Sequence, residues 1–278
     1  GEEVARAEAH AGCFLAVDSG AVLHQVPGSP TKDPVFSLDA LWIEASTREQ
    51  AERAGYTVIE PSAVISTHLA EVVKQYAAEL LSRQDVQTLI ENAKTINQAA
   101  VEELVPGVLQ IGDVQKVLQH LLRERVPIRD MVTILETMAD FGARVKDPDQ
   151  LGELVRASIA RTITRQFLDA DHKLYCITLE PGLERRLTET VTATSYGTSL
   201  VLDPPEQKEL VEMVQTEVDR AMAAGHQAVL LCGAGLRLPL RRLIEKYMPQ
   251  LHVLAYNEVA ERADVEFVAQ VRATQPAF

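Results

Sequence analysis

The chain has 278 residues, of which 46% are hydrophobic and 24% charged, a balance typical of a folded globular protein rather than a disordered one. We expect two or more compact units, because single hydrophobic cores stop growing near roughly 250–300 residues. The formal net charge of −13 disfavours binding to nucleic acid or anionic lipid and favours basic or neutral partners. The three cysteines are far apart, which argues against a disulfide framework or a zinc site, and no apolar run is long enough for a membrane span.

The first part of the chain predicts a small inserted α/β subdomain over residues 12–60. Ser46 and Glu49 have the spacing of a capping box for a helix that Gly55 can end. Strand-like runs flank this helix, at residues 13–18, 41–44 and 56–59. The chain begins abruptly and without a signal peptide, as a fragment of a longer protein would. Residues 1–11 and 61–80 are expected to be the remainder of a first subdomain that is truncated here, an expectation that rests on the family resemblance given below.

A long helix is predicted to begin at Pro61 and to bury one broad face. The apolar residues that recur at helical spacing are Val64, Ile65, Leu69, Val72, Val73, Tyr76 and Leu80. Residues 81–160 keep a helical pattern and predict a helical subdomain. Its expected helix N-caps are Asp85, Asp113 and Asp147.

The remaining residues, 161–278, predict a C-terminal α/β subdomain. Strand-like runs at residues 174–179, 228–232 and 252–256 are separated by amphipathic helices at about 207–223 and 236–247. The expected fold class is therefore α+β with several subdomains: small α/β units, a central helical domain and a C-terminal α/β domain.

One rival function is a nucleotide-binding enzyme. Gly233-Ala234-Gly235 follows a strand and opens a basic helix, and a glycine turn at a helix N-terminus can hold phosphate. However, the chain has neither a Walker sequence nor the third glycine of the dinucleotide fingerprint, and glycine is the default residue in any tight turn.

Other chemistry is weakly indicated. Cys176 has His172 nearby but no third orienting group, and His68 has no metal-binding partner at a suitable spacing. The basic residues Arg123, Arg125 and Arg129 are interrupted by acids, so they favour an ion-pair network over nucleic-acid binding. We expect no catalysis, no cofactor, no bound metal and no nucleic-acid partner.

Several strings are similar to the FlhA (FHIPEP) family, the export gate proteins of flagella and type III secretion. They lie at residues 31–36 (TKDPVF), 41–44 (LWIE), 52–58 (ERAGYTV), 64–69 (VISTHL) and 117–130 (VLQHLLRERVPIRD), with looser matches at 179–184 (LEPGLE) and 230–233 (LLCG). An amphipathic helix ending before a proline needs only the right pattern, so identity over such lengths indicates common ancestry. The resemblance runs from about residue 12 to about 270 and leans toward the flagellar branch.

The resemblance implies a non-enzymatic docking platform at the cytoplasmic face of the bacterial inner membrane. Its expected partners are export chaperones loaded with substrates, other components of the export apparatus including the ATPase complex, and further copies of itself in a nonameric ring. The membrane would be reached only through an N-terminal half that this chain lacks. A second possible function, that of a purely structural component of the ring, stays open. It needs the same contacts between subunits as a docking platform but no open pocket.

In the family, the docking surface is a hydrophobic dimple. The residues carried over by the resemblance are Asp33, Phe36 and Thr67, with an apolar lining of Val17, Leu38, Ile59 and Val64. Asp33-Pro34 predicts a rigid turn that presents Phe36 as an aromatic anchor. The plainer interpretation makes Phe36 and Leu38 ordinary core, Asp33 a turn cap and Thr67 a solvent-facing residue. Family members often carry proline where this chain has Ser19, which predicts a different rim.

Overall fold

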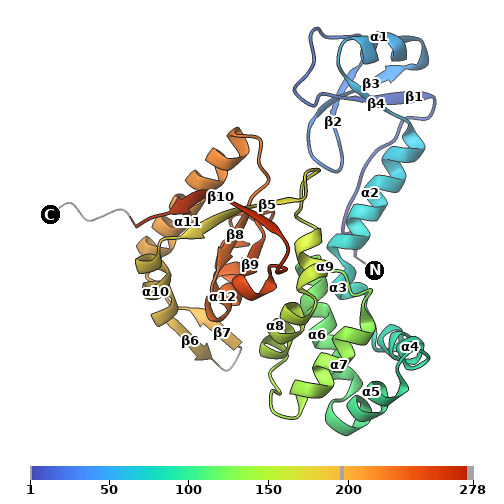
Figure 1. Cartoon of the computed structure of the whole chain (residues 1–278). Coiled ribbons are helices and arrows are strands. Elements are labelled where there is room, and N and C mark those ends of the chain that lie inside the picture. Colours follow the sequence, from blue (N-terminus) through green and yellow to red (C-terminus); the bar gives the residue numbers. More distant parts are fainter. Residues whose placement is uncertain (1, 195–196, 274–278) are drawn as a thin grey trace, which may run out of the picture. The chain divides into compact units, whose positions relative to one another are not determined.

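The computed structural model describes residues 2–194 and 197–273, which separate into two compact units, Gly1–Leu80 and Leu81–Phe278 (Figure 1). We call them unit 1 and unit 2 and describe each by itself. The finer division at residues 11, 60, 80 and 160 stays a prediction. None of the described helices combines the length and the apolar composition that crossing a bilayer requires.

Unit 1 is built on a four-stranded antiparallel sheet in the order β2-β3-β1-β4. The strands are β1 (Cys13–Val17), β2 (Ser29–Lys32), β3 (Asp39–Glu44) and β4 (Thr57–Ile59). The three strand-like runs of the sequence are thus strands, and β2 adds an edge strand to them. Because successive side chains in a strand point to opposite faces, β1, β3 and β4 each contribute to two separate apolar layers.

The two layers face different helices. On one face, Ala16 and Ile43 pack with Ala51 of a short helix, α1 (Arg48–Arg53), which a 3₁₀ turn, η1 (Ala45–Thr47), precedes. On the other face, Val17 and Trp42 pack with Val64 of the long helix α2 (Pro61–Gln75), which leads into α3 (Ala77–Leu80). The candidate site described below lies on this second face.

The start of α1 differs from the predicted capping box, and its end agrees with prediction. The N-cap residue is Thr47, which makes no side-chain cap, because the turn η1 places Ser46 before the helix begins. Gly55 follows the C-cap Ala54 with φ +95°, a left-handed conformation that glycine adopts without strain. A Cβ atom there would lie 2.4 Å from the carbonyl oxygen of Ala21.

Gly55→Ala should therefore lower the free energy of unfolding by about 1–3 kcal/mol, because it adds both backbone strain and a clash with a carbonyl. Gly20→Ala is the matched control: Gly20 has φ +89° but open space around its Cβ position, so only the strain applies. Urea unfolding of both variants checks this, and an equal loss in the two would contradict the role given to the Ala21 contact.

The prediction that α2 buries a broad apolar face is wrong. Val64 is buried, but Ile65, Leu69, Val73 and Leu80 are all exposed. The extended residues 2–10 lie beside this face, with the Tyr76 hydroxyl donating to the Val4 carbonyl at 3.3 Å, and they cover it only in part. Helical spacing shows which residues share a face but not whether anything covers that face.

Unit 2 begins with a helical part whose elements enclose one core. They are α4 (Arg83–Lys94), α5 (Gln98–Glu102), the π-helical turn η2 (Glu103–Val108), α6 (Ile111–Arg123), α7 (Met131–Gly142), α8 (Pro148–Ser158) and α9 (Ala160–Arg165). Of the three expected N-caps, only Asp147 is one. Asp85 and Asp113 lie three residues inside α4 and α6, where their carboxylates accept from the backbone N–H of Ser82 and Gln110.

An α/β layer follows, with a parallel sheet in the order β10-β5-β8-β9. Its strands are β5 (Lys173–Leu179), β8 (Val229–Cys232), β9 (Val253–Ala255) and β10 (Asp264–Val271), and its helices are α10 (Pro181–Glu189), α11 (Pro204–Ala223) and α12 (Ala234–Ile244). A hairpin of β6 (Val191–Thr194) and β7 (Gly197–Leu200) and a 3₁₀ turn, η3 (Tyr256–Glu258), complete it. The expected strands and helices are present, with ends that differ by a few residues.

The parallel sheet of unit 2 carries apolar side chains on both faces. Leu174, Cys176 and Leu231 join the core of the helical part. Ile177 and Leu230 join a second core with α10, α11 and α12. The helical part and the parallel sheet therefore share one continuous core, which explains why they form a single compact unit.

Candidate functional site

An open pocket of about 200 Å³ lies in unit 1 between the sheet, the β2–β3 connection and α2. Its lining residues come from four separate stretches of the chain: Val17, Ser19, Asp33, Val35, Phe36, Leu38, Thr57, Ile59, Val64 and Thr67. The structure thus brings together all seven residues that the resemblance singled out. It adds Val35 and Thr57, and it places Ser19 among the lining residues.

The buried part of the pocket is apolar because of the strand alternation. Val17 on β1 and Val64 on α2 are buried, and Ile59 on β4 is partly buried beside them. Val17 is paired with Thr57 across the β1–β4 ladder, which brings Thr57 into the lining. Thr67 is exposed one turn further along α2 than Val64.

The turn after β2 holds one wall of the pocket, and Asp33 organises it. The Asp33 carboxylate accepts hydrogen bonds from the backbone N–H groups of Val35 at 3.1 Å and Phe36 at 2.6 Å. The backbone of Asp33 also bonds to that of Ser37 and Leu38, at 2.9 and 2.8 Å. With Asp33 only 6% exposed, its carboxylate is engaged in shaping this turn, as the plainer interpretation of Asp33 expected.

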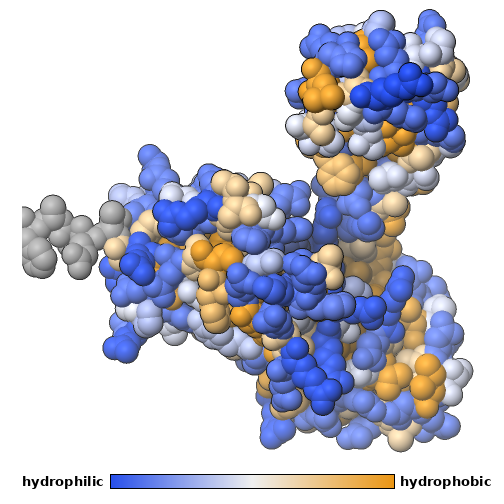
Figure 2. Space-filling view, turned by 45° about the horizontal axis from the view of Figure 1, so that its top comes forward, coloured by the Kyte–Doolittle hydropathy of each residue, from blue (hydrophilic) through white to orange (hydrophobic). Residues whose placement is uncertain are grey.

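The same interpretation is wrong for the aromatic residue. Phe36 is 72% exposed and Leu38 is also exposed, so neither is ordinary core. Exposed apolar side chains interrupt a largely hydrophilic surface in several places (Figure 2). Phe36 differs from a scattered surface residue because a hydrogen-bonded turn fixes its backbone at the edge of an apolar hollow. This arrangement suits an apolar side chain of a partner that packs on Phe36 and enters the pocket.

The role of Asp33 can be tested by comparing two substitutions. Asp33→Ala leaves two backbone N–H groups without their acceptor and should lower the free energy of unfolding by about 1–2 kcal/mol. Asp33→Asn keeps an acceptor oxygen and should lose less than half of that. Chemical denaturation measures both variants, and an equal loss would show that the negative charge, and not the turn, is what matters.

The second candidate site, the glycine turn before α12, is closed to phosphate. The N–H of Gly233 donates to the Glu184 carboxylate at 2.6 Å, so a negative charge of the chain itself already occupies the helix N-terminus. The arginines of α12 are engaged as well. Arg237 binds Glu124 and Glu153, Arg241 donates to backbone carbonyls, and Arg242 binds Asp149 at 2.6 Å. The nucleotide-binding alternative is therefore wrong.

Nucleophilic catalysis finds no support at Cys176 either. The residue is fully buried, and burial raises the pKa of its thiol to about 12, so the reactive thiolate does not form near neutral pH. Within residues 2–194 and 197–273, no cluster of three or more His, Cys, Asp or Glu side chains could hold a metal ion.

Comparison with known proteins decides the family. The FHIPEP family matches residues 1–264, nearly the whole chain. The chain belongs to the FHIPEP family. It is 37% identical over 271 residues to the flagellar biosynthesis protein FlhA of Bacillus subtilis, an alignment that covers 98% of the chain and 40% of that relative. The chain thus spans about two fifths of the length of the curated FHIPEP relatives it matches.

Solved structures agree on the fold. The Chlamydia pneumoniae CdsV protein superposes with a TM-score of 0.84 at 23% identity, covering 96% of this chain and 77% of that one. CdsV has also been solved in complex with CdsO. The nonameric SctV-C of EPEC gives a TM-score of 0.75 at 22% identity, covering 93% of this chain and 78% of that one. The expected family and the expected α+β fold class are thereby confirmed.

Proposed function

We propose that this chain is the cytosolic docking platform of a flagellar export gate protein. In this proposal the unit 1 pocket binds export chaperones that carry substrates, and the full-length protein passes the substrates to the membrane channel. One observation supports it most strongly. Residues from β1, the turn after β2, β4 and α2 form an open apolar pocket beside an exposed, rigidly presented Phe36.

Wider features of the proposal rest on relatives. A nonameric SctV-C supports a ring of nine copies in the full-length protein, and the CdsV complex with CdsO supports contact with a further component. Contact with the ATPase complex rests on the family resemblance alone. The proposal places the chain at the cytoplasmic face of the inner membrane, attached through a membrane-embedded part outside the chain. The higher identity to flagellar FlhA sequences than to the solved CdsV and SctV-C structures supports the flagellar branch.

The test is calorimetric titration of the folded chain with a flagellar export chaperone bound to its substrate. The proposal expects saturable one-to-one binding with a Kd of about micromolar, the affinity suited to repeated docking and release. A chain that is folded by circular dichroism and yet shows no heat of binding at about tenfold higher concentrations contradicts docking on this part of the protein.

A further inference from the structure

An open groove of about 560 Å³ lies in unit 2, at the carboxyl end of the parallel sheet. It is lined by the end of β5, the second half of β10, the start of α10 and a tyrosine of η3. From β5 the chain continues to β8 and β9 on one side of the sheet, and it returns to β10 on the other side (Figure 1). In open α/β sheets, ligands commonly bind at the carboxyl ends of strands where the strand order changes direction in this way.

Strand β10 forms one edge of the sheet, and its outer side is unpaired. Its backbone pairs with β5, and the Val271 carbonyl also accepts from the N–H of Glu180. In the part of the chain that the structure describes, no other element bonds to the β10 backbone. With eight residues β10 is longer than the edge strands β2, β4 and β9, which have four, three and three. Such an edge presents a row of N–H and C=O groups with which an extended peptide can pair.

Two exposed aromatic side chains stand beside this edge. Phe267 of β10 is 63% exposed, Tyr256 of η3 is 47% exposed, and both line the groove. A bulge follows Phe267 directly, because Val268 has no partner in β5 and the ladder resumes at Ala269. Bulges re-aim side chains and are over-represented at sheet edges and next to active sites. The faces of such rings attract the cationic head of a lysine or arginine side chain.

Glu184 supplies the charge of the groove. Among the described residues that line the groove, Glu184 alone is charged. One of its carboxylate oxygens accepts from the Gly233 N–H at 2.6 Å, and the other has only the Tyr256 hydroxyl, at 3.4 Å. A carboxylate has room for about four hydrogen bonds, so the cap on Gly233 leaves acceptor positions open toward the groove.

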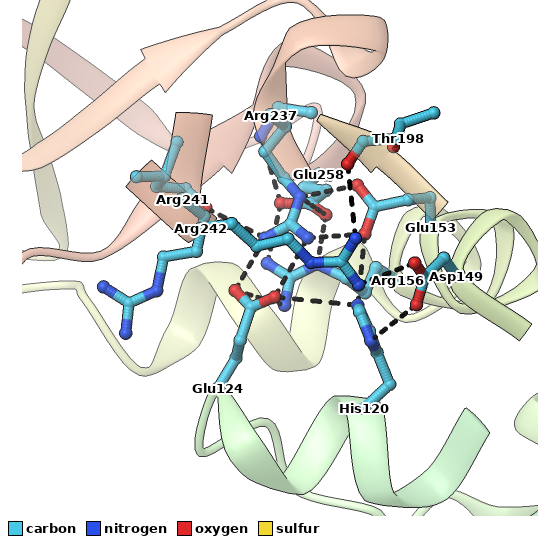
Figure 3. Close-up of polar contacts among 12 residues, drawn as sticks. His120, Glu124, Asp149, Glu153, Arg156, Thr198, Arg237, Arg241, Arg242 and Glu258 are labelled. Carbon is cyan, nitrogen blue, oxygen red and sulfur yellow. Dashed lines mark hydrogen bonds and ion pairs between the residues drawn. The ribbon is translucent and has the colours of Figure 1, made fainter. Parts of the chain in front are cut away.

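None of the described basic side chains forms an ion pair with Glu184. The arginines of α12 turn to other partners, with Arg237 at the centre of a buried network of charged side chains (Figure 3). The other members of this network are Glu124, Glu153, Arg156 and Glu258. Arg272 lies beside the groove, but its Nε donates to the Gln270 side chain at 3.2 Å. The groove thus combines a carboxylate without a cationic partner, two aromatic rings and an open strand edge.

We propose that this groove binds an extended, basic segment of another protein. The segment adds a strand to the outer edge of β10, and one of its arginine or lysine side chains packs on Tyr256 and Phe267 and reaches Glu184. Main-chain hydrogen bonds give affinity, and the charge of Glu184 selects a basic residue over an acidic one. A second copy pairing through its own β10, DVEFVAQV, offers no basic residue. The surface lies in unit 2 and is independent of the pocket of unit 1.

The test titrates the full chain with a synthetic peptide, acetylated and amidated, of sequence Ser-Thr-Val-Thr-Arg-Thr-Val-Thr-Ser. We call it the arginine peptide; it places one arginine between two valines on the same face of a strand. NMR should show saturable shifts of the β10 amides with a Kd below about 1 mM, while the amides of β2, an edge strand of unit 1, stay in place. A peptide with glutamate in place of the arginine should bind at least about tenfold more weakly. A peptide that is N-methylated on alternate residues, and so cannot donate along one edge, should not bind.

Substitutions in the chain separate the charge from the rings. Glu184→Gln keeps an acceptor for Gly233 and should weaken binding of the arginine peptide at least about tenfold. Phe267→Ser, at an exposed residue, should weaken it at least about fivefold. Glu189→Gln is the matched control, since Glu189 is exposed on the same helix as Glu184 but does not line the groove, and it should leave the affinity unchanged.

Four results overturn the proposal. They are equal affinities for the arginine and glutamate peptides, native affinity in Glu184→Gln, no shift of any β10 amide at about 5 mM arginine peptide, and a dimer of the chain that Phe267→Ser dissociates. The last result would mean that a second copy covers the edge. Should Glu184→Gln fail to fold, the two peptides on the native chain decide between a basic and an acidic partner. None of these results bears on chaperone docking, which rests on unit 1.

Discussion

Phe36→Ala should weaken binding of a chaperone–substrate complex by about 30- to 1,000-fold, equivalent to about 2–4 kcal/mol. The expected loss is large because a few anchor residues, often aromatic, contribute most of the affinity of such interfaces. The ring is 72% exposed in the free chain, so little core packing depends on it. The free energy of unfolding should therefore change by no more than about 0.5 kcal/mol.

Leu23→Ala is the matched control for Phe36→Ala. Leu23 is an apolar residue of the same unit, 83% exposed, and is not among the residues that line the pocket. Calorimetric titration of the two variants should show native affinity for Leu23→Ala and loss for Phe36→Ala. Equal affinities would remove Phe36 as an anchor, and a Phe36→Ala chain that unfolds more easily would return it to a structural role.

The largest loss of stability is expected from Arg237→Met. Arg237 is fully buried and pairs with Glu124 and Glu153. Removing it leaves Glu124 with only the longer contact to Arg156, at 3.3 Å, and takes from Glu153 its guanidinium partner. Breaking a buried ion pair from one side costs about 3–5 kcal/mol. Urea unfolding at neutral pH should show this loss. Arg242→Met, on the same helix but partly exposed, should cost about 1 kcal/mol or less.

A double variant separates uncompensated charge from lost packing. Arg237→Met with Glu124→Gln also removes the charge of one of the two carboxylates that lose Arg237, so the double variant should be more stable than Arg237→Met alone. If the double variant loses the full sum of both changes, packing and not charge explains the effect.

Acid should weaken the ion pairs that Glu124 makes with Arg237 and Arg156. Burial alone would raise the pKa of Glu124, but the charges of Arg237 and Arg156 outweigh it and hold the pKa at about 2. The carboxylate is thus more acidic in the folded chain than in the unfolded one. Its contribution to stability is complete above the unfolded value of about 4.3 and is lost as the pH falls from there toward about 2. Arg237→Met should shrink this acid dependence.

Local sequence signals predicted most of the elements but not their surroundings. Strands β1, β3 and β4 lie on the strand-like runs of the sequence, and Gly55 ends α1 as its position indicated. The exposed face of α2 could not be predicted, because periodicity carries no information on what covers a helix. The edge strand β10 was missed because its alternating residues, DVEFVAQV, include three acidic or amide side chains.

The sequence located the pocket of unit 1 but not the charged network around Arg237. Residue identity shared with a family located the pocket, whereas composition and spacing alone favoured burial of Phe36. The network around Arg237 was not predicted, because its partners lie 84 and 113 residues away in the sequence. Glu124 lies between the arginines expected to form ion pairs, and it is the residue of that string whose carboxylate binds Arg156 and Arg237. Such pairings depend on tertiary structure, which local patterns do not contain.

The most direct test of docking at the pocket is methyl NMR of the chain during titration with a chaperone–substrate complex. Methyl groups of Leu38, Ile59 and Val64 line the pocket, and those of Leu23 and Ile96 are exposed elsewhere. The account predicts that the first three resonances shift or broaden at substoichiometric partner while the other two stay in place. Unchanged pocket methyls in a sample that binds the partner would contradict it and place docking on another surface.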